Sequence, residues 1–137
     1  MPSEVSAGAV IFRRENATVK YLLLQYNAGH WDYVKGHIEK GEEELATVKR
    51  ECQEETGITD LEIIPGFHHE MHFFFRRNNE TISKKVYFYL AETKTKEITL
   101  TEHIGFEWLP YEEALKKVTF SNSRELLKKA HEVVEKL

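Results

Sequence analysis

The sequence predicts an α+β fold with a mixed β-sheet, and three observations lead to that fold class. Stretches rich in β-branched and aromatic residues, which favour strands, fill much of the first two-thirds of the chain. Apolar residues recur at helical spacing once in the middle of the chain and twice near its end. Strands and helices do not alternate strictly, so a sheet of mixed rather than purely parallel strands is expected.

The first predicted elements form a hairpin. Residues 7–14 (AGAVIFRR) and 19–27 (VKYLLLQYN) are apolar, and the polar stretch ENAT separates them. Residues 36–44 (GHIEKGEEE) follow and contain two glycines, which indicates a loop.

A helix is expected over residues 43–56. Its apolar residues recur at helical spacing, and of these Leu45, Val48 and Cys52 are expected to face the core. Gly57 stands where a glycine commonly ends a helix.

The second half of the chain predicts further strands and then helices. Strand-like stretches cover residues 60–67, 68–77 and 84–93, and NNET at 78–81 is typical of a hairpin turn. Residues 103–110 predict a last strand that Pro110 stops. Helical patterns cover 111–118 and 123–137, and either Ser121 or Ser123 is expected to cap the final helix.

Length and composition predict one domain spanning residues 1–137. A chain of 137 residues with 41% hydrophobic residues can bury an ordinary core. The net charge of -4 argues against binding of extended nucleic acid or of a membrane surface. A single cysteine excludes an internal disulfide, and the sequence predicts neither a signal peptide nor a membrane-spanning segment. We therefore expect a cytoplasmic protein.

The stretch RECQEETG (50–57) crowds three glutamates, Glu51, Glu54 and Glu55, onto one side of the expected helix. Like charges at this spacing repel each other by roughly 0.2–0.5 kcal/mol per pair, so a neighbouring cation is expected to offset them. One interpretation is a solvated face paired with Lys49 and Arg50. The other is a site for a hard divalent cation such as Mg²⁺, which prefers carboxylate oxygens.

The spacing of the longer stretch favours the metal site. Residues 36–58 have the form G-x5-E-x7-R-E-U-x-E-E-x-G-U, where U is apolar, and the chain fills every fixed position with Gly36, Glu42, Arg50, Glu51, Cys52, Glu54, Glu55, Gly57 and Ile58. This pattern resembles the Nudix box, the signature of the Nudix hydrolases. The resemblance implies a mixed sheet sandwiched between helices and hydrolysis of a nucleoside diphosphate linked to another group, dependent on Mg²⁺ or Mn²⁺.

The box also suggests individual roles. Glu51, Glu54 and Glu55 are the expected metal ligands, and a glycine lets the loop backbone approach, so the Gly36 carbonyl is expected to complete the set. Arg50 is expected to orient a carboxylate through a bidentate bond.

The flanking residues resemble one group within the family, the asymmetrical bis(5'-nucleosyl)-tetraphosphatases, which hydrolyse diadenosine tetraphosphate to ATP and AMP. The resemblance covers SAGAVIFRR, VKYLLLQ, HWDYVKGHIEKGEE, GFHHEMHF, KKVYFYLAE and EHIGFEWLPYEEA. It implies that the substrate-binding residues are His30, Lys35, Lys84 (or Lys85), Phe73 (or Phe74) and Phe120. It also implies that Glu102 is a metal ligand or a base, and that Glu54 or Glu102 accepts the proton of the attacking water.

Some features depart from the group or leave alternatives. Members of the group often carry two prolines where this chain has Tyr33 and Val34. The aromatic residues that the resemblance implies clamp an adenine are Phe here instead of Tyr. Other Nudix activities remain open, namely removal of pyrophosphate from RNA 5' ends and sanitation of nucleoside triphosphates, as does a non-catalytic nucleotide-binding regulator. His68, His69 and His72 lack cysteine partners, which argues against a structural zinc site. The oligomeric state is not indicated.

Overall fold

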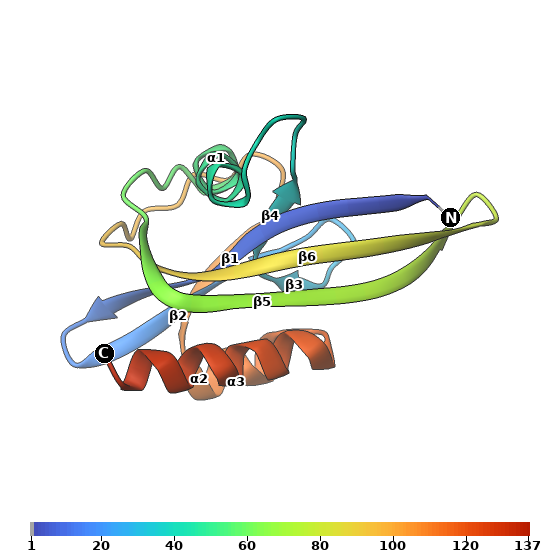
Figure 1. Ribbon diagram of the computed structural model, residues 1–137. Helices are drawn as coiled ribbons and strands as arrows, with labels where there is room; N and C mark the ends of the chain where they lie inside the picture. Colours follow the sequence, from blue (N-terminus) through green and yellow to red (C-terminus); the bar gives the residue numbers. More distant parts are fainter. Residues whose placement is uncertain (1) are drawn as a thin grey trace.

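The computed structural model describes residues 2–137 and shows a mixed sheet with helices on both faces (Figure 1). The expected domain begins at Met1, which lies outside the described residues. The strands are β1 (Ser3–Glu15), β2 (Thr18–Gln25), β3 (Trp31–Asp32), β4 (Val34–His37), β5 (Glu62–Arg77), β6 (Glu80–Glu92) and β7 (Gly105–Pro110). The helices are α1 (Glu44–Thr56), α2 (Tyr111–Lys117) and α3 (Ser121–Glu135).

The sheet is mixed, as the sequence predicts. Its strands follow the order β3-β2-β1-β6-β5, while β4 also pairs with β1 and β7 also pairs with β2. β1 and β6 are parallel, and the other pairs are antiparallel. The helix α1 covers one face, and α2 and α3 cover the other (Figure 1). The prediction of a sheet sandwiched between helices is therefore confirmed.

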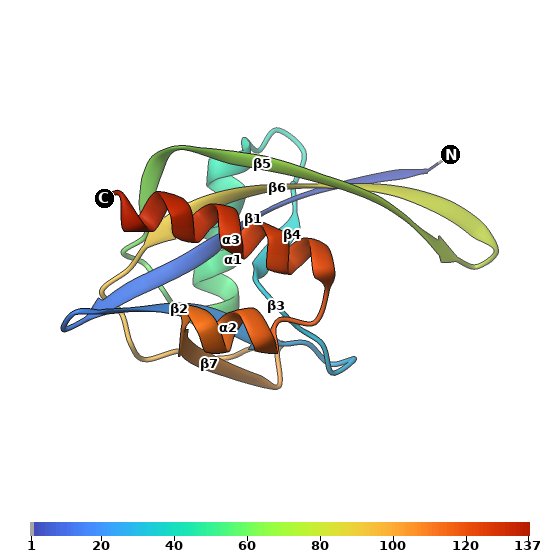
Figure 2. The ribbon, with the colours of Figure 1, turned by 90° about the horizontal axis from the view of Figure 1, so that it is seen from below.

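Both predicted hairpins are present; β2 ends at Gln25 instead of residue 27, and the other three strands are longer than expected. β1 begins at Ser3 instead of residue 7, because its first residues pair with β6 from the register Ser3↔Ser83 onward. The stretches 60–67 and 68–77 form a single strand, β5, with an irregularity between Ile63 and His68. β5 and β6 extend together beyond the helices as a long arm (Figure 2).

The turn of the second hairpin has the predicted position and a clear cause. Asn78 and Asn79 have φ angles of 51° and 63°, the left-handed conformation that asparagine tolerates better than most residues. Two such residues between antiparallel strands match the right-handed twist of a hairpin.

The predicted glutamate helix is confirmed, but its buried side differs from the expectation. Val48 and Cys52 are buried, whereas Leu45 is 39% exposed. Leu45 lies in the first turn and lines a shallow surface pocket, while Thr47 and Glu55 occupy inward positions instead. Gly57 ends the helix in the left-handed conformation, with φ 79°, as predicted.

The end of the chain corrects one further expectation. Pro110 ends β7 as predicted, but neither Ser121 nor Ser123 caps α3. The N-cap residue is Phe120, without a side-chain cap bond, and the buried Ser123 donates its hydroxyl to Asp32 Oδ1 at 3.1 Å instead. The serine therefore ties α3 to β3.

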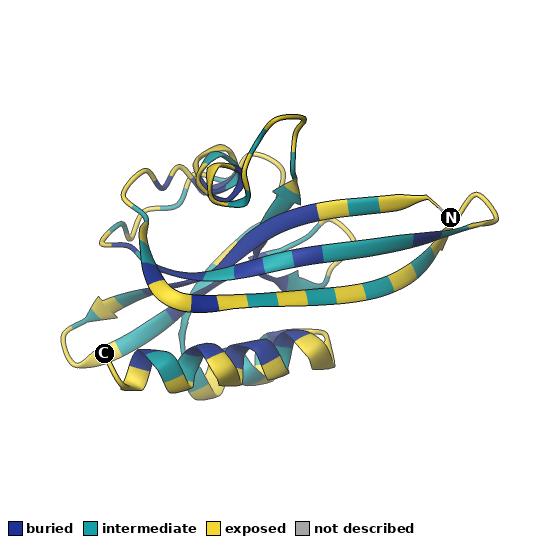
Figure 3. Cartoon of the chain, viewed as in Figure 1, coloured by how far each residue is buried: buried dark blue, intermediate teal, exposed yellow. Residues whose placement is uncertain are grey.

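The sheet separates two cores (Figure 3). One lies against α2 and α3 and includes Tyr33, Phe88 and Leu127. The other lies under α1 and includes Ile11, Val48 and other buried residues. Within residues 2–137, no helix has the length and apolar character needed to cross a membrane.

Candidate functional site

The predicted carboxylates meet in one pocket of about 330 Å³, here called the glutamate pocket. It is lined by Tyr26, Asn27, Lys35, Gly36, His37, Glu39, Glu51, Glu54, Glu55, Glu102 and His103. Three of the glutamates come from α1, and Glu102 comes from the segment before β7. The chain thus gathers the four predicted carboxylates although Glu51 and Glu102 lie 51 positions apart in the sequence.

Gly36 lets β4 approach the helix closely. Its backbone pairs with Ala7 of β1, and a Cβ atom at this position would lie 2.0 Å from the Glu51 carboxyl carbon. No side chain fits in that distance, so the glycine is required for the Glu51 carboxylate to lie against the β4 backbone.

Arg50 organises the acidic residues around it. Its guanidinium binds Glu42 through two hydrogen bonds, of 2.7 Å from Nε and 3.0 Å from Nη2. It also donates to Glu51 at 2.8 Å, to Glu54 at 3.2 Å and to the His37 carbonyl at 3.0 Å. These bonds are the expected bidentate arrangement, and they hold the pKa of Glu42 at about 2.

Glu55 lies deepest in the glutamate pocket. It is 4% exposed, and neither carboxylate oxygen accepts a hydrogen bond within residues 2–137. His103 Nε2 lies 3.4 Å from Oε1, and burial lowers the pKa of this histidine. Burial raises the pKa of Glu55 well above its ordinary value, and the neighbouring Glu51 adds to the shift.

The donor set fits a divalent cation. A buried carboxylate without a hydrogen-bond partner among residues 2–137, beside four further glutamates, supplies the hard oxygen ligands that such cations bind. Arg50 donates hydrogen bonds to Glu51 and Glu54, which holds both carboxylates beside its guanidinium. Among residues 2–137, no group of three acidic, histidine or cysteine side chains is arranged to hold a metal ion.

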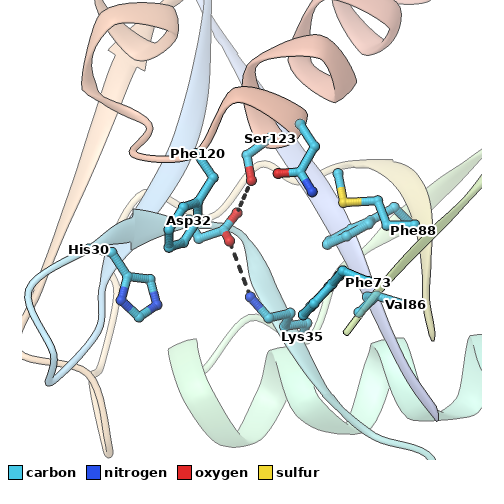
Figure 4. A pocket seen from close by; sticks show the side chains of 10 residues that line it. His30, Asp32, Lys35, Phe73, Val86, Phe88, Phe120 and Ser123 are labelled. Atoms are coloured by element: carbon cyan, nitrogen blue, oxygen red, sulfur yellow. Dashed lines mark hydrogen bonds and ion pairs between the residues drawn. The ribbon is translucent and has the colours of Figure 1, made fainter. Parts of the chain in front are cut away.

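A second, mostly apolar pocket of about 370 Å³ lies on the α3 side of the sheet and is here called the aromatic pocket. It is lined by His30, Asp32, Lys35, Met71, Phe73, Val86, Phe88, Phe120, Asn122 and Ser123 (Figure 4). Phe73 comes from β5, and Phe120 from the start of α3, where it is 45% exposed. Phe74 points to the other face and is 58% exposed, as strand alternation requires.

Lys35 lines both pockets. Its ammonium lies 3.2 Å from Asp32 Oδ2, and Asp32 Oδ1 accepts a bond from the Ser123 hydroxyl (Figure 4). The Tyr33 amide donates to the same Oδ1 at 2.9 Å. Asp32 therefore holds the lysine between the apolar space and the carboxylates.

Lys84 takes a different place from the other predicted cations. Within the described residues, Lys84 lines neither pocket. It lies opposite Phe73 in the β5–β6 hairpin. Burial lowers its pKa, and the charge of Lys35 lowers it further, so the two ammonium groups influence each other.

Three residues of the site were not singled out from the sequence: Tyr26, Asp32 and His103. Asp32 is one of only two aspartates in the chain and His103 follows Glu102, but neither feature by itself indicates a contact. Tyr26 ends an apolar run and is read as part of a strand. Their positions depend on the pairing of β2 with β3 and β7.

Comparison with known proteins decides the family. The family model described as NUDIX domain matches residues 2–130. The chain belongs to the Nudix family. This confirms the family predicted from the box, whose Gly36–Ile58 stretch forms the end of β4, a loop, α1 and the turn after it.

Several relatives of this Nudix protein are similar over almost its whole length. The asymmetrical bis(5'-nucleosyl)-tetraphosphatase of Mus musculus is 39% identical over 140 residues, covering 93% of this chain and 92% of that protein. The Caenorhabditis elegans protein of the same name is 31% identical, covering 90% and 91%. The crystal structure of a C. elegans Ap4A hydrolase binary complex superposes with a TM-score of 0.81 at 29% identity, covering 98% of this chain and 99% of that one.

Proposed function

We propose that this Nudix protein is an asymmetrical bis(5'-nucleosyl)-tetraphosphatase that hydrolyses diadenosine tetraphosphate to AMP and ATP. The observation that carries the proposal is the position of Lys35, which lines both the glutamate pocket and the aromatic pocket. A substrate with a flat base at one end and a long anionic chain matches this pair of adjoining spaces. The names of the relatives from Mus musculus and C. elegans support the same activity.

The aromatic pocket suits an adenine. Phe73 and Phe120 supply rings from two different elements, and Val86 and Phe88 add apolar surface. Stacking of a base on aromatic rings contributes roughly 1–3 kcal/mol per base. The pocket therefore holds one nucleoside of the substrate and leaves the phosphate chain to extend past Lys35.

Lysine ammonium groups and a histidine along the path hold the phosphates. Lys35 lies at the junction of the two pockets, and His30 lies beside Phe120, their ring centroids 5.2 Å apart. Lys84 lies beyond Phe73 on β6, where burial lowers its pKa first and the charge of Lys35 lowers it further. Several donors are needed because the register of the chain decides which phosphate is attacked.

The cation we propose is Mg²⁺, with Mn²⁺ as the alternative. Glu51, Glu54 and Glu55 would hold it together with the Gly36 carbonyl. When bound, it neutralises the phosphate charge and polarises the phosphorus. Arg50 contributes by orienting Glu51 and Glu54 through its hydrogen bonds to them.

Hydrolysis needs a group that takes the proton of the attacking water. Glu54 already accepts a bond from Arg50, whereas the Glu102 carboxylate accepts no hydrogen bond from the described residues. We therefore assign proton acceptance to Glu102, with Glu54 as the alternative. Attack on a phosphorus that bears a nucleoside yields AMP and ATP.

A substrate panel tests the proposal. Diadenosine polyphosphates, nucleoside triphosphates and 5'-triphosphate RNA are incubated with the protein and Mg²⁺, and the products are separated by ion-exchange chromatography. We expect diadenosine tetraphosphate to have the highest kcat/KM. A preference for the RNA or for a nucleoside triphosphate would replace this activity with one of the other Nudix activities, and no turnover at all would favour a non-catalytic binding protein.

We further propose that the protein works in the cytoplasm. Its single cysteine, Cys52, is buried and forms no disulfide, which suits a reducing compartment.

A further inference from the structure

Four aromatic rings form a continuous row between the two pockets. The ring of Phe120 lies against His30 at a centroid distance of 5.2 Å, and His30 stacks on Tyr26 at 4.7 Å with an interplanar angle of 12°. Tyr26 also contacts His103 in a perpendicular arrangement, with ring centroids 4.4 Å apart and an interplanar angle of 90°. His103 Nε2 then lies 3.4 Å from Glu55 Oε1, so the row runs from the aromatic pocket to the deepest carboxylate.

The backbone between β2 and β3 creates the centre of this row. The Tyr26 amide donates to the His30 carbonyl at 2.9 Å, and the Gly29 amide donates to the Tyr26 carbonyl at 2.7 Å. Gly29 has a φ angle of 102°, which permits this tight turn. Residues four apart in the sequence are thereby brought face to face, and their rings stack.

Main-chain bonds also fix both ends of the row. The Ile104 amide donates to the Gln25 carbonyl at 2.9 Å, which holds His103 beside Tyr26. At the other end Trp31 and Thr119 exchange two bonds, of 2.8 Å to the threonine hydroxyl and 3.1 Å to the Trp31 carbonyl. These bonds hold the start of α3, and with it Phe120, beside the turn.

Tyr26 itself is tied in place on two further sides. Its hydroxyl donates to the Tyr33 carbonyl, and the Lys35 ammonium lies over its ring at 4.8 Å from the centroid. A cation over an aromatic face at this distance is attracted to it. One ring therefore contacts His30, His103 and Lys35, three groups that belong to the two pockets.

We propose that Tyr26 is a positioning residue that sets the phosphate register of the reaction. The inference rests on the proposed function, because it concerns which phosphorus of a base-anchored dinucleotide faces the glutamate pocket. The rigid row fixes the span from Phe120 to Glu55, and Tyr26 also fixes Lys35 beside that span. Displacement of a reacting group by only about 1 Å can cost on the order of a hundredfold in rate. If the row of rings no longer holds the substrate in place, attack on the usual phosphorus slows and attack on a neighbouring phosphorus competes.

The test compares the products of Tyr26→Phe and Tyr26→Leu with those of the unchanged protein, using diadenosine tetraphosphate. Tyr26→Phe keeps the ring and loses only the bond to Tyr33, so AMP and ATP should remain the products. Tyr26→Leu removes the ring, and we expect the ADP fraction to rise at least about tenfold as neighbouring phosphates are attacked. Phe74→Leu serves as the control, because that exposed ring lies outside the row and both pockets.

The product ratio also separates positioning from loss of fold. Only folded molecules turn over, so a lower folded fraction reduces both products equally and leaves their ratio unchanged. A Tyr26→Leu protein that still gives AMP and ATP in the original ratio overturns the inference. If the unchanged protein does not cleave diadenosine tetraphosphate, the proposed function fails instead, so the two failures are distinguishable.

Discussion

Arg50 and Glu42 form a two-bond ion pair, with Nε 2.7 Å from Oε2 and Nη2 3.0 Å from Oε1. Glu42 precedes α1 and Arg50 lies in its middle, so the pair ties the loop of the box to the helix. The same guanidinium reaches two of the proposed metal ligands, Glu51 and Glu54. The pair therefore connects loop shape with carboxylate orientation.

Replacing Arg50 by lysine should weaken metal binding more than it weakens the fold. Lysine keeps the charge but cannot form the planar two-bond contact or reach several carboxylates at once. We expect Arg50→Lys to lose about 10- to 100-fold in Mn²⁺ affinity, measured by titration calorimetry, and a similar factor in kcat/KM. Lys49→Ala, which changes an exposed neighbour, should match the unchanged protein. Equal Mn²⁺ affinity in Arg50→Lys would rule out this role.

Protonation of Glu42 gives the ion pair a defined pH dependence. Its pKa falls from 4.5 to about 2, first through the Arg50 bonds and then through the Thr47 hydroxyl. A lowered folded-state pKa stabilises the fold above the unfolded pKa, and the gain is lost as pH falls through the folded value. The difference in Tm between the unchanged protein and Glu42→Gln should be constant above about pH 4.5 and shrink toward pH 2. A difference that persists undiminished at pH 2 would contradict the assignment.

A methyl group at Gly36 should disable the glutamate pocket. The new Cβ would meet the Glu51 carboxylate atoms at 2.0–2.4 Å, so the strand and the ligand must move apart. We expect Gly36→Ala to lower kcat by about a hundredfold. In the matched control Gly105→Ala, the nearest atom is the flexible end of Gln25 at 3.3 Å, and activity should change little. Similar rates for both variants would show that the close approach is unimportant.

The proposed base clamp predicts a binding defect. Phe120→Ala removes one stacking surface, worth roughly 1–3 kcal/mol, so KM should rise about 5- to 150-fold with a smaller change in kcat. Phe74→Ala is the matched control, because Phe74 is as aromatic and more exposed but does not line the aromatic pocket. Steady-state kinetics with diadenosine tetraphosphate distinguish the two. Identical KM values for both variants would show that Phe120 does not bind the base.

Features that depend on local chemistry could be predicted from the sequence. The glutamate helix, its C-terminal Gly57 and the Asn78–Asn79 turn follow from residue spacing and backbone preference. The gathering of Gly36, Glu51 and Glu55 in one pocket follows from the box.

Features set by tertiary contacts could not be predicted in this way. Leu45 has the spacing of a core residue, but it is 39% exposed and lines a surface pocket beside β1 and β6. Ser123 bonds to Asp32 instead of capping its own helix. Tyr26 and His103 lie 77 positions apart and meet only because β7 pairs with β2. No periodicity along the chain indicates that contact.

The most direct test of the proposed reaction is hydrolysis of diadenosine tetraphosphate in ¹⁸O-labelled water with Mg²⁺, followed by mass spectrometry of the products. If the base is anchored beside Phe120 and the nucleoside-bearing phosphorus faces the glutamate pocket, the products are AMP and ATP, the label is in AMP, and excess chelator abolishes turnover. Label found only in ATP, ADP as the main product, or full activity in excess chelator would contradict the account.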